Sequence, residues 1–322
     1  MTVDLLLSKA IEVFLIARLS DSYSKATISQ YKWALDRFVN QEDKSLSHIT
    51  TADIRRFLAY LQTDYQPVRP GGNAAPLGSA SIFAAWKAIR AFYKWASPEL
   101  GIENPSAKIP PPKHMSAVII PLSQEEIKLL LRACEKLKTT TTDKRQSYTM
   151  TRPTASRDRA ILLTLLDTGL RVGELCRLKV SDCNLRTGEI VVNPIGSGVK
   201  SRARVVPLGA SSRKAISLYL ALDNTDENAP LFQKDEGGFM DRGNVLHSLV
   251  GLGKRAGVRN VHPHRVRHTF AIQYLRNGGD VFSLQRILGH TTLTMTQHYL
   301  ALANADDAEA HRRASPVDMW KL

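Results

Sequence analysis

A cluster of prolines in the first half of the chain limits how it can fold. Its members are Pro105, Pro110, Pro111, Pro112 and Pro121. Proline has no backbone N–H and its ring clashes with the preceding helical turn, so no regular helix continues through this segment. Consecutive prolines favour an extended polyproline conformation instead. Since 322 residues also exceed one typical domain, we expect two domains, at 1–110 and 122–322, joined by a linker at 111–121.

The first domain carries the apolar periodicity of amphipathic helices. One set of apolar residues recurs at helical spacing, namely Ile28, Tyr31, Leu35 and Phe38. A second helix is expected to begin at a capping box formed by Thr50 and Asp53. A third, over 79–96, has an apolar face of Ile82, Trp86, Ile89 and Tyr93 and a basic face of Lys87, Arg90 and Lys94. The basic face is either an ordinary solvated surface or a surface that binds DNA.

The second domain is expected to be mainly helical with one small β-hairpin. A capping box at Ser123 and Glu126 predicts one helix, and an apolar helix over 159–169 ends at Gly169. The segments GEIVVNP and ARVVPL predict two antiparallel strands, joined by the turn IGSGVKSR. Further helices are expected downstream. Residues 136–157 are basic and threonine-rich, and predict a loop or disordered insertion that contacts DNA, a neighbouring subunit or neither.

The positive charge lies mostly in the second domain. Residues 1–110 carry a net charge of +3, and the remainder carries +11 of the total of +14. A basic protein gains affinity for nucleic acid by releasing phosphate counterions, although a merely basic surface is equally compatible with this charge. The three cysteines form no CxxC pair, which argues against a disulfide framework or a zinc ribbon. No apolar run is long enough to span a membrane, so we expect a cytoplasmic protein without a membrane partner.

The segment HPHRVRHTFA, residues 262–271, concentrates histidine and arginine. His264 and His268 would share one helical face, a spacing that could suit a metal ion. Arg265 and Arg267, however, put permanent positive charge on the same turn, which disfavours a cation. Guanidinium groups match phosphate oxygens with two parallel hydrogen bonds, so an anion is the better candidate.

Four further residues extend this cluster into a pattern along the chain. Arg171 lies in TGLRVGEL, Lys200 in the hairpin turn, His290 at the end of ILGH and Tyr299 in TMTQHYL. Together with HPHRVRHTFA, these boxes closely resemble those of the tyrosine recombinase (phage integrase) family. The resemblance covers nearly the whole chain, since the N-terminal helices also look like the core-binding domain of that family.

The resemblance implies a fold, a reaction and partners. The fold would be mainly α with a small antiparallel β-hairpin or sheet (α+β), with a helical, SAM-like core-binding domain at 1–110 and a catalytic domain with a C-terminal tail at 122–322. The protein would cleave and rejoin DNA through a 3′-phosphotyrosine intermediate, as a Xer-like resolvase or a mobile-element integrase. It would act on double-stranded DNA with paired inverted-repeat core sites, as a homo-tetramer of two dimers. We expect it at the nucleoid of a bacterium or archaeon.

The resemblance also assigns roles to individual residues. Tyr299 would attack the phosphorus and must lose its proton to do so, since the ordinary pKa of tyrosine is about 10. Arg171 and Arg267 would hold the two non-bridging oxygens, where negative charge builds up in the transition state. His264 would be the general base, and His290 would donate a hydrogen bond to the phosphate.

The same resemblance assigns roles to the remaining site residues. Lys200 would be the general acid for the departing 5′ oxygen, although its turn has serine where the family often has G-K-G. Glu174 matches an acidic position that supports the site. Contacts with DNA are expected at Lys87, Arg90, Lys94 and Arg202. No cofactor and no metal ion are expected, because two arginines supply the charge that a metal would otherwise bring.

Two other functions are compatible with these residues. A type IB topoisomerase uses a similar site, and a catalytically silent DNA-binding protein would keep the same fold. The compact N-terminal helices and the short tail after Tyr299 favour a recombinase over a topoisomerase. The apolar end of that tail is expected to dock on a neighbouring subunit, through Val317, Met319, Trp320 and Leu322.

Overall fold

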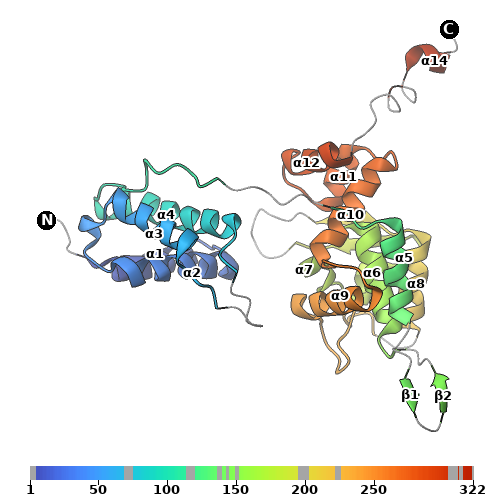
Figure 1. Ribbon diagram of the computed structural model, residues 1–322. Helices are drawn as coiled ribbons and strands as arrows, with labels where there is room; N and C mark the ends of the chain where they lie inside the picture. Colours follow the sequence, from blue (N-terminus) through green and yellow to red (C-terminus); the bar gives the residue numbers. More distant parts are fainter. Residues whose placement is uncertain are drawn as a thin grey trace. The chain divides into compact units, whose positions relative to one another are not determined.

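The computed structural model describes residues 5–68, 75–113, 120–135, 140–142, 145–148, 152–194, 203–221, 226–303, 311 and 315–320. The chain divides into two compact units, Met1–Val118 and Ile119–Leu322 (Figure 1). Each unit has a hydrophobic core of its own. The division falls within the proline-rich segment 111–121. The fold is mainly α-helical with small antiparallel sheets, as the sequence predicts.

Unit 1 is a helical domain. It contains α1 (Leu7–Ser20), α2 (Lys25–Glu42), the 3-10 turn η1 (Leu46–His48), α3 (Thr51–Thr63) and α4 (Ser79–Leu100). Its core is rich in aromatic side chains that are almost completely buried, among them Phe14, Phe38, Phe57 and Phe92. The predicted capping box is present, since the Thr50 hydroxyl accepts a hydrogen bond from the Asp53 backbone N–H and the Asp53 carboxylate accepts one from the Thr50 N–H. Local sequence signals therefore define where α3 begins.

Unit 2 is built around one central helix. Helix α6 (Ala155–Thr168) contacts α5 (Gln124–Glu135), α8 (Ala210–Leu220), α9 (Arg242–Ala256) and α10 (Pro263–Arg276). Short elements follow α6, namely α7 (Val172–Leu175) and the 3-10 turn η2 (Val180–Asp182). The apolar composition of α6 explains its position, because a helix that is hydrophobic on most sides is stable only when it is covered by others.

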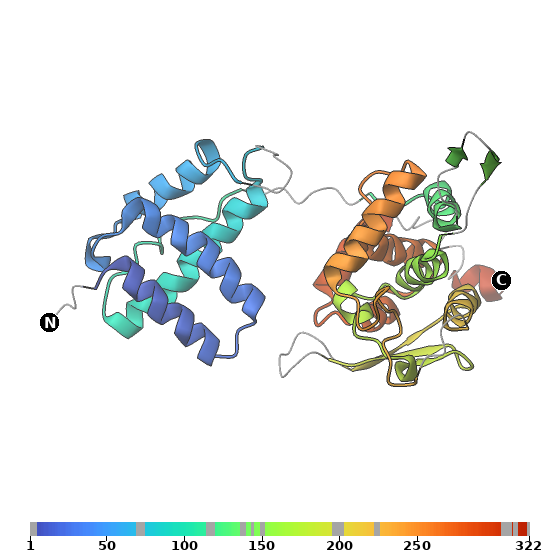
Figure 2. The ribbon, with the colours of Figure 1, turned by 90° about the horizontal axis from the view of Figure 1, so that it is seen from below.

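The predicted hairpin is confirmed and belongs to a three-stranded sheet. Strands β4 (Glu189–Val192) and β5 (Arg204–Pro207) pair in antiparallel fashion, with Ile190 opposite Val206. A short strand that the sequence did not predict, β3 (Cys183–Asn184), adds to β4. The sheet lies along one side of the helices of unit 2 (Figure 2), and β5 contacts α11 (Val281–Leu288).

The prediction of a loop or disordered insertion at 136–157 is wrong in part. Strands β1 (Thr140–Thr142) and β2 (Arg145–Tyr148) pair as an antiparallel hairpin, and Ala155 already begins α6. Polar composition favours a loop, but threonine is β-branched and fits an extended strand well. The other residues of this segment that lie before Arg152 are outside the described part of the chain.

The last helices of unit 2 form a small apolar cluster beneath the predicted nucleophile. Helices α10, α11 and α12 (Thr294–Ala303) pack together through Phe270, Leu284 and Leu288, and the Tyr299 ring belongs to the same cluster. Beyond it, α14 (Pro316–Trp320) exposes Val317, Met319 and Trp320. The cluster explains why the Tyr299 ring is buried.

Candidate active site

The turn between α6 and α7 positions the first arginine. Gly169 ends α6 with a φ of +59°, and a Cβ atom at this position would lie 2.3 Å from the Phe270 ring. Glycine is therefore required here both by the left-handed backbone and by the close contact. Helix α7 begins three residues later, at Val172, and Arg171 lies immediately before it. The Arg171 side chain is 33% exposed, so a ligand in solution can reach it.

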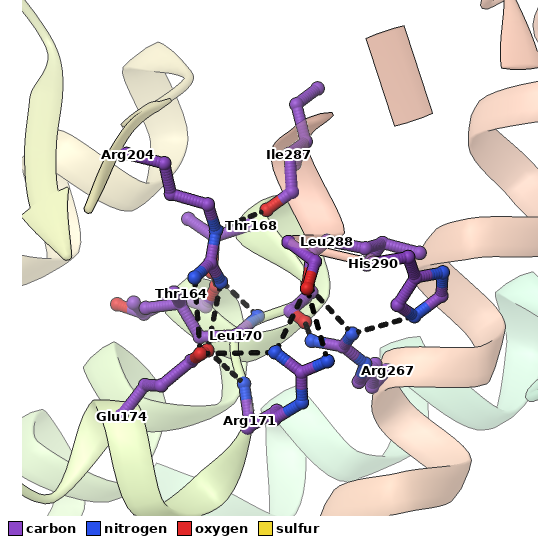
Figure 3. A network of polar contacts seen from close by, with 12 residues as sticks. Thr164, Thr168, Leu170, Arg171, Glu174, Arg204, Arg267, Ile287, Leu288 and His290 are labelled. Carbon is purple, nitrogen blue, oxygen red and sulfur yellow. Dashed lines mark hydrogen bonds and ion pairs between the residues drawn. The ribbon is translucent and has the colours of Figure 1, made fainter. Parts of the chain in front are cut away.

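A buried carboxylate contacts two arginines at once. Glu174 accepts hydrogen bonds from Arg204 Nη1 and Nη2 at 3.0 and 2.8 Å, and from the Arg171 backbone N–H and Nη1 at 2.9 and 3.2 Å (Figure 3). Burial alone would raise the pKa of the Glu174 carboxyl, but the hydrogen bonds and charge of Arg204, together with Arg171, lower that pKa to about 2. Glu174 is therefore ionised at neutral pH, and it fixes the orientation of both guanidinium groups.

Backbone carbonyls at the ends of two helices also face the arginines. The carbonyl of Leu288, the last residue of α11, accepts hydrogen bonds from Arg171 Nη1 at 3.2 Å and from Arg267 Nη2 at 2.9 Å (Figure 3). Three further backbone carbonyls accept hydrogen bonds from guanidinium groups: that of Gly289 from Arg171, that of Ile287 from Arg204, and that of Gly169 from Arg267. Helix C-termini carry partial negative charge, which favours cations without neutralising them. Within the described network, three arginines share one carboxylate, so the site keeps an excess of positive charge.

Arg267 is the most buried of the three arginines. Arg267 is 5% exposed, and burial, followed by the charge of Arg171, lowers its pKa to about 10. The guanidinium therefore remains charged at neutral pH. A buried cation of this kind is stable only when its hydrogen bonds are satisfied, and the Gly169 and Leu288 carbonyls satisfy them here.

His290 joins this network with a defined tautomer. Its Nε2 lies 3.0 Å from Arg267 Nη2 and its Nδ1 lies 2.9 Å from the hydroxyl of Thr296. A guanidinium can only donate, so Nε2 accepts and Nδ1 carries the hydrogen that is donated to Thr296. Burial, followed by the charges of Arg267, Arg171 and Arg204, lowers the pKa of His290 to about 4, which keeps the ring neutral.

This arrangement bears on the expectation that His290 donates to a phosphate. In this structure His290 Nε2 is an acceptor, and its hydrogen-bond partner is Arg267. For His290 to donate to a phosphate, the hydrogen bond from Arg267 to Nε2 must break and Nε2 must gain a proton. The donor role of His290 stays a prediction.

Tyr299 lies beside His290 and bonds to another histidine. Its ring stacks on the His290 ring with centroids 6.2 Å apart and an interplanar angle of 11°. The Tyr299 hydroxyl lies 2.7 Å from Nδ1 of His268, and the residue is 5% exposed. Burial raises the pKa of Tyr299, while the charge of Arg267 acts in the opposite direction. Arg171, Glu174, Arg267, His290 and Tyr299 are thus brought together from four separate segments of the chain.

His264 stands apart from the hydrogen-bond network. It lies at the start of α10 and is exposed, and its ring centroid is 6.4 Å from that of His268. Partial burial, followed by the charges of Arg267 and Arg171, lowers its pKa. His262 has a structural role, because its Nδ1 accepts a hydrogen bond from the Arg265 backbone N–H at the start of α10. Lys200 and Arg202 lie outside the described residues.

The basic face of α4 is present in unit 1. Lys87, Arg90 and Lys94 are all exposed. Arg90 donates hydrogen bonds to the carbonyls of Ser106 and Ala107 at 3.3 and 3.2 Å, so part of its donor capacity is used within the unit. Lys87 lies over the Phe83 ring at 4.4 Å. Contact of these residues with DNA stays a prediction.

Three contacting residues were not identified from the sequence as parts of the site. Arg204 is the main partner of Glu174, Thr296 holds His290, and His268 contacts Tyr299. Two of them had a sequence signal, since His268 belongs to the cluster at 262–271 and Thr296 lies three residues before Tyr299 on the same helical face. Across the described part of the chain, no group of three or more His, Cys, Asp or Glu side chains could hold a metal ion. None of the described helices is long and apolar enough to cross a membrane.

Comparisons with known proteins match both units. Residues 121–306 match the model of the phage integrase family, and residues 11–99 match the model of its N-terminal SAM-like domain. Tyrosine recombinase XerA of Thermococcus kodakarensis is 31% identical over 298 residues, which cover 92% of this chain and 91% of that protein.

Two solved structures are similar in fold. The integrase of the Tn1549 transposon, in complex with transposon right end DNA, is 18% identical with a TM-score of 0.73, over 97% of this chain and 99% of that one. A lambda integrase tetramer bound to a Holliday junction is 20% identical with a TM-score of 0.66, over 90% of this chain and 79% of that one. At these identities the likeness concerns the fold.

Proposed function

This chain belongs to the phage integrase family and is a site-specific tyrosine recombinase, and we propose that Arg171 and Arg267 bind the DNA phosphate that Tyr299 attacks. One observation carries the assignment. Arg171 and Arg267 donate hydrogen bonds to the same Leu288 carbonyl. Arg267 is also hydrogen-bonded to His290, and the His290 ring stacks on the Tyr299 ring. Two fixed guanidinium groups and a phenol therefore converge on one place.

The excess of positive charge supports phosphate as the ligand. Arg171 and Arg204 pair with the Glu174 carboxylate, whereas the hydrogen-bond partners of Arg267 are uncharged, so a phosphodiester would supply the negative charge that balances the remaining positive charge. Guanidinium groups that are already held in place need little reorganisation when charge develops on the phosphate oxygens. Arg171, at 33% exposure, would be the first to meet the DNA backbone.

A bound phosphate would also change the state of His290. The phosphate would compete for the Arg267 Nη2 hydrogen, and its negative charge would raise the pKa of His290. Nε2 could then gain a proton and donate to the phosphate, as the sequence predicts. In this proposal the contact between Arg267 and His290 belongs to the DNA-free state.

The remaining roles are proposed from the match to the family motifs. Lys200 would protonate the leaving 5′ oxygen, Glu174 would hold Arg171, and His264 would assist proton transfer on the attacking side. Lys87, Arg90, Lys94 and Arg202 would contact the DNA backbone. The similarity of the folded chain to DNA-bound integrases supports double-stranded DNA as the partner.

Assembly and location are proposed in the same way. We propose a homo-tetramer of two dimers on paired inverted-repeat sites, supported by the lambda integrase tetramer of similar fold. The proposed place of action is cytoplasmic DNA at the nucleoid. Formation of exchanged products from two sites would separate this function from topoisomerase-like relaxation, and covalent capture of DNA would separate it from silent binding.

A covalent-capture experiment tests the assignment of Tyr299. The substrate is a nicked duplex with a site selected from random DNA by the wild-type protein, so that cleavage releases a short fragment and traps the adduct. Tyr299→Phe should bind this duplex like the wild type but form no adduct on a denaturing gel. Tyr274→Phe, on α10, is the matched control and should form the adduct. An adduct with Tyr299→Phe would refute the assignment.

A further inference from the structure

The environment of the Tyr299 hydroxyl identifies a second histidine near the reacting atom. Tyr299 Oη lies 2.7 Å from His268 Nδ1, and the ring centroids are 5.5 Å apart. His268 lies on α10, one residue after Arg267, so the same helical turn carries a phosphate-binding candidate and the partner of the phenol. His264 makes no comparable contact with Tyr299 among the described hydrogen bonds, although it is the histidine that the motif suggests.

The direction of this hydrogen bond follows from the donors around it. Burial raises the pKa of Tyr299, so the phenol keeps its proton at neutral pH. Arg267, the charged neighbour of that hydroxyl, can donate but not accept. Among the described residues, His268 Nδ1 is therefore the acceptor toward which the phenolic hydrogen points.

We propose that His268 orients Tyr299 and accepts its proton as the tyrosine attacks DNA. The inference rests on the proposed function, in which Tyr299 is the nucleophile. In the forward step the Oη–phosphorus bond forms, the bond from phosphorus to the 5′ oxygen breaks, the phenolic proton moves to His268 Nδ1, and the general acid protonates the 5′ oxygen. In rejoining, the 5′ hydroxyl returns its proton to the deprotonated general acid as its oxygen bonds to phosphorus, the Oη–phosphorus bond breaks, and His268 returns the other proton to Tyr299.

The charges around His268 are consistent with this role. His262, His264 and Arg267 lie on α10 with it, and His298 faces it from α12. Burial, followed by the electrostatic influence of His264, Arg267, His262 and His298, lowers the pKa of His268 to about 4, so the ring is neutral and able to accept a proton at neutral pH. An incoming phosphate would offset the positive charge of Arg267 and make the ring a stronger base when DNA is bound.

Two variants separate proton transfer from a purely structural contact. The measurement is the single-turnover rate of adduct formation on the saturating nicked duplex. His268→Ala should slow it by about 100- to 10,000-fold, the usual contribution of a general base. His268→Asn keeps a polar side chain near the position of Nδ1 but cannot take up a proton, and should be slow as well. His298→Ala, beside Tyr299 but exposed, is the matched control and should stay near the wild-type rate.

Chemical rescue and the pH profile complete the test. Added imidazole should partly restore His268→Ala, whereas sodium chloride at equal ionic strength should not. Between about pH 5 and 8 the wild-type rate should depend less steeply on pH than the His268→Ala rate, because His268 takes up the phenolic proton in the wild type, whereas the variant depends on tyrosinate that forms only as the pH rises. A near-wild-type rate for His268→Asn, or an unrescued His268→Ala with a flat pH profile, would overturn the proposal. If the wild type forms no adduct, or Tyr299→Phe forms one, the result refutes Tyr299 as the nucleophile and not the role of His268.

Discussion

Replacing Glu174 with glutamine should destabilise unit 2 strongly, even though the two side chains are almost equal in size. The Glu174 side chain is 3% exposed and accepts four hydrogen bonds from Arg171 and Arg204. Glutamine has one acceptor oxygen, and its amide group would face guanidinium donors. Arg204, at 8% side-chain exposure, would lose the carboxylate that compensates its charge.

Two independent arguments give the magnitude. The pKa of Glu174 falls from 4.5 to about 2 on folding. At about 1.4 kcal/mol for each unit of pKa, this difference corresponds to about 3 kcal/mol of stability. Loss of one partner from a buried ion pair typically destabilises by about 3–5 kcal/mol. We therefore expect Glu174→Gln to lower the free energy of unfolding of unit 2 by about 3 kcal/mol.

The chain offers an internal control for this measurement. Trp33, Trp86 and Trp95 all lie in unit 1, and the fourth tryptophan, Trp320, lies in the tail. Urea unfolding followed by tryptophan fluorescence therefore reports mainly on unit 1, while far-ultraviolet circular dichroism reports on both units. Glu174→Gln should shift the circular-dichroism transition but leave the fluorescence transition in place. Glu135→Gln, which removes an exposed ion pair with Arg159, should change stability by less than about 1 kcal/mol.

The pH dependence of the stability difference between wild type and Glu174→Gln can refute this prediction. The folded pKa of Glu174 lies below its ordinary value, so its stabilisation is complete above pH 4.5 and is lost as the pH falls toward about 2. The difference between wild type and Glu174→Gln should therefore shrink below pH 4.5. Equal effects of Glu174→Gln and Glu135→Gln, or a difference that does not depend on pH in this range, would contradict the argument.

Three further predictions concern the reaction and the assembly. Lys200→Ala should slow cleavage of normal DNA by about 100- to 10,000-fold but cleave a duplex with sulfur at the 5′ bridging position at nearly the wild-type rate, because a thiolate leaves without a proton; failure of sulfur to rescue would show that Lys200 is not the general acid. Chelators should leave cleavage unchanged, since Arg171 and Arg267 supply the positive charge, and activity lost in chelator and restored by a divalent ion would contradict this. Deleting residues 315–322 should reduce synapsis of two sites more than binding to one site in gel-shift assays, whereas equal losses would indicate that the tail stabilises its own unit.

The sequence predicts well those features that depend on local signals. The capping boxes at Thr50 and Ser123 and the left-handed glycine at Gly169 are each present where the sequence places them. The segments GEIVVNP and ARVVPL, joined by a short turn, likewise predicted β4 and β5 as a hairpin. These signals succeed because each depends on residues close together in the chain.

Contacts between distant segments were beyond the reach of the same reasoning. Arg171 meets the Leu288 carbonyl, 117 residues away, and a carbonyl group has no side-chain signature. The spacing of three histidines between His262 and His268 could not show which of them faces Tyr299, because that depends on how α10 and α12 pack. Threonines that look like loop residues at 140–142 form a strand, since the pairing partner determines the outcome.

The use of main-chain carbonyls as arginine partners restricts how this protein can vary. Ile287, Leu288 and Gly289 offer backbone oxygens, so these acceptor atoms do not depend on the chemistry of the side chains, and Leu288 is restricted instead by its place in the apolar cluster. Substitution of Gly289 by a larger residue is disfavoured, because a Cβ atom there would lie 2.9 Å from the Arg204 guanidinium. One residue inserted into or deleted from α11 would rotate its last carbonyls by about 100°, away from all three arginines at once. The length of α11 is therefore under stronger constraint than most of its sequence.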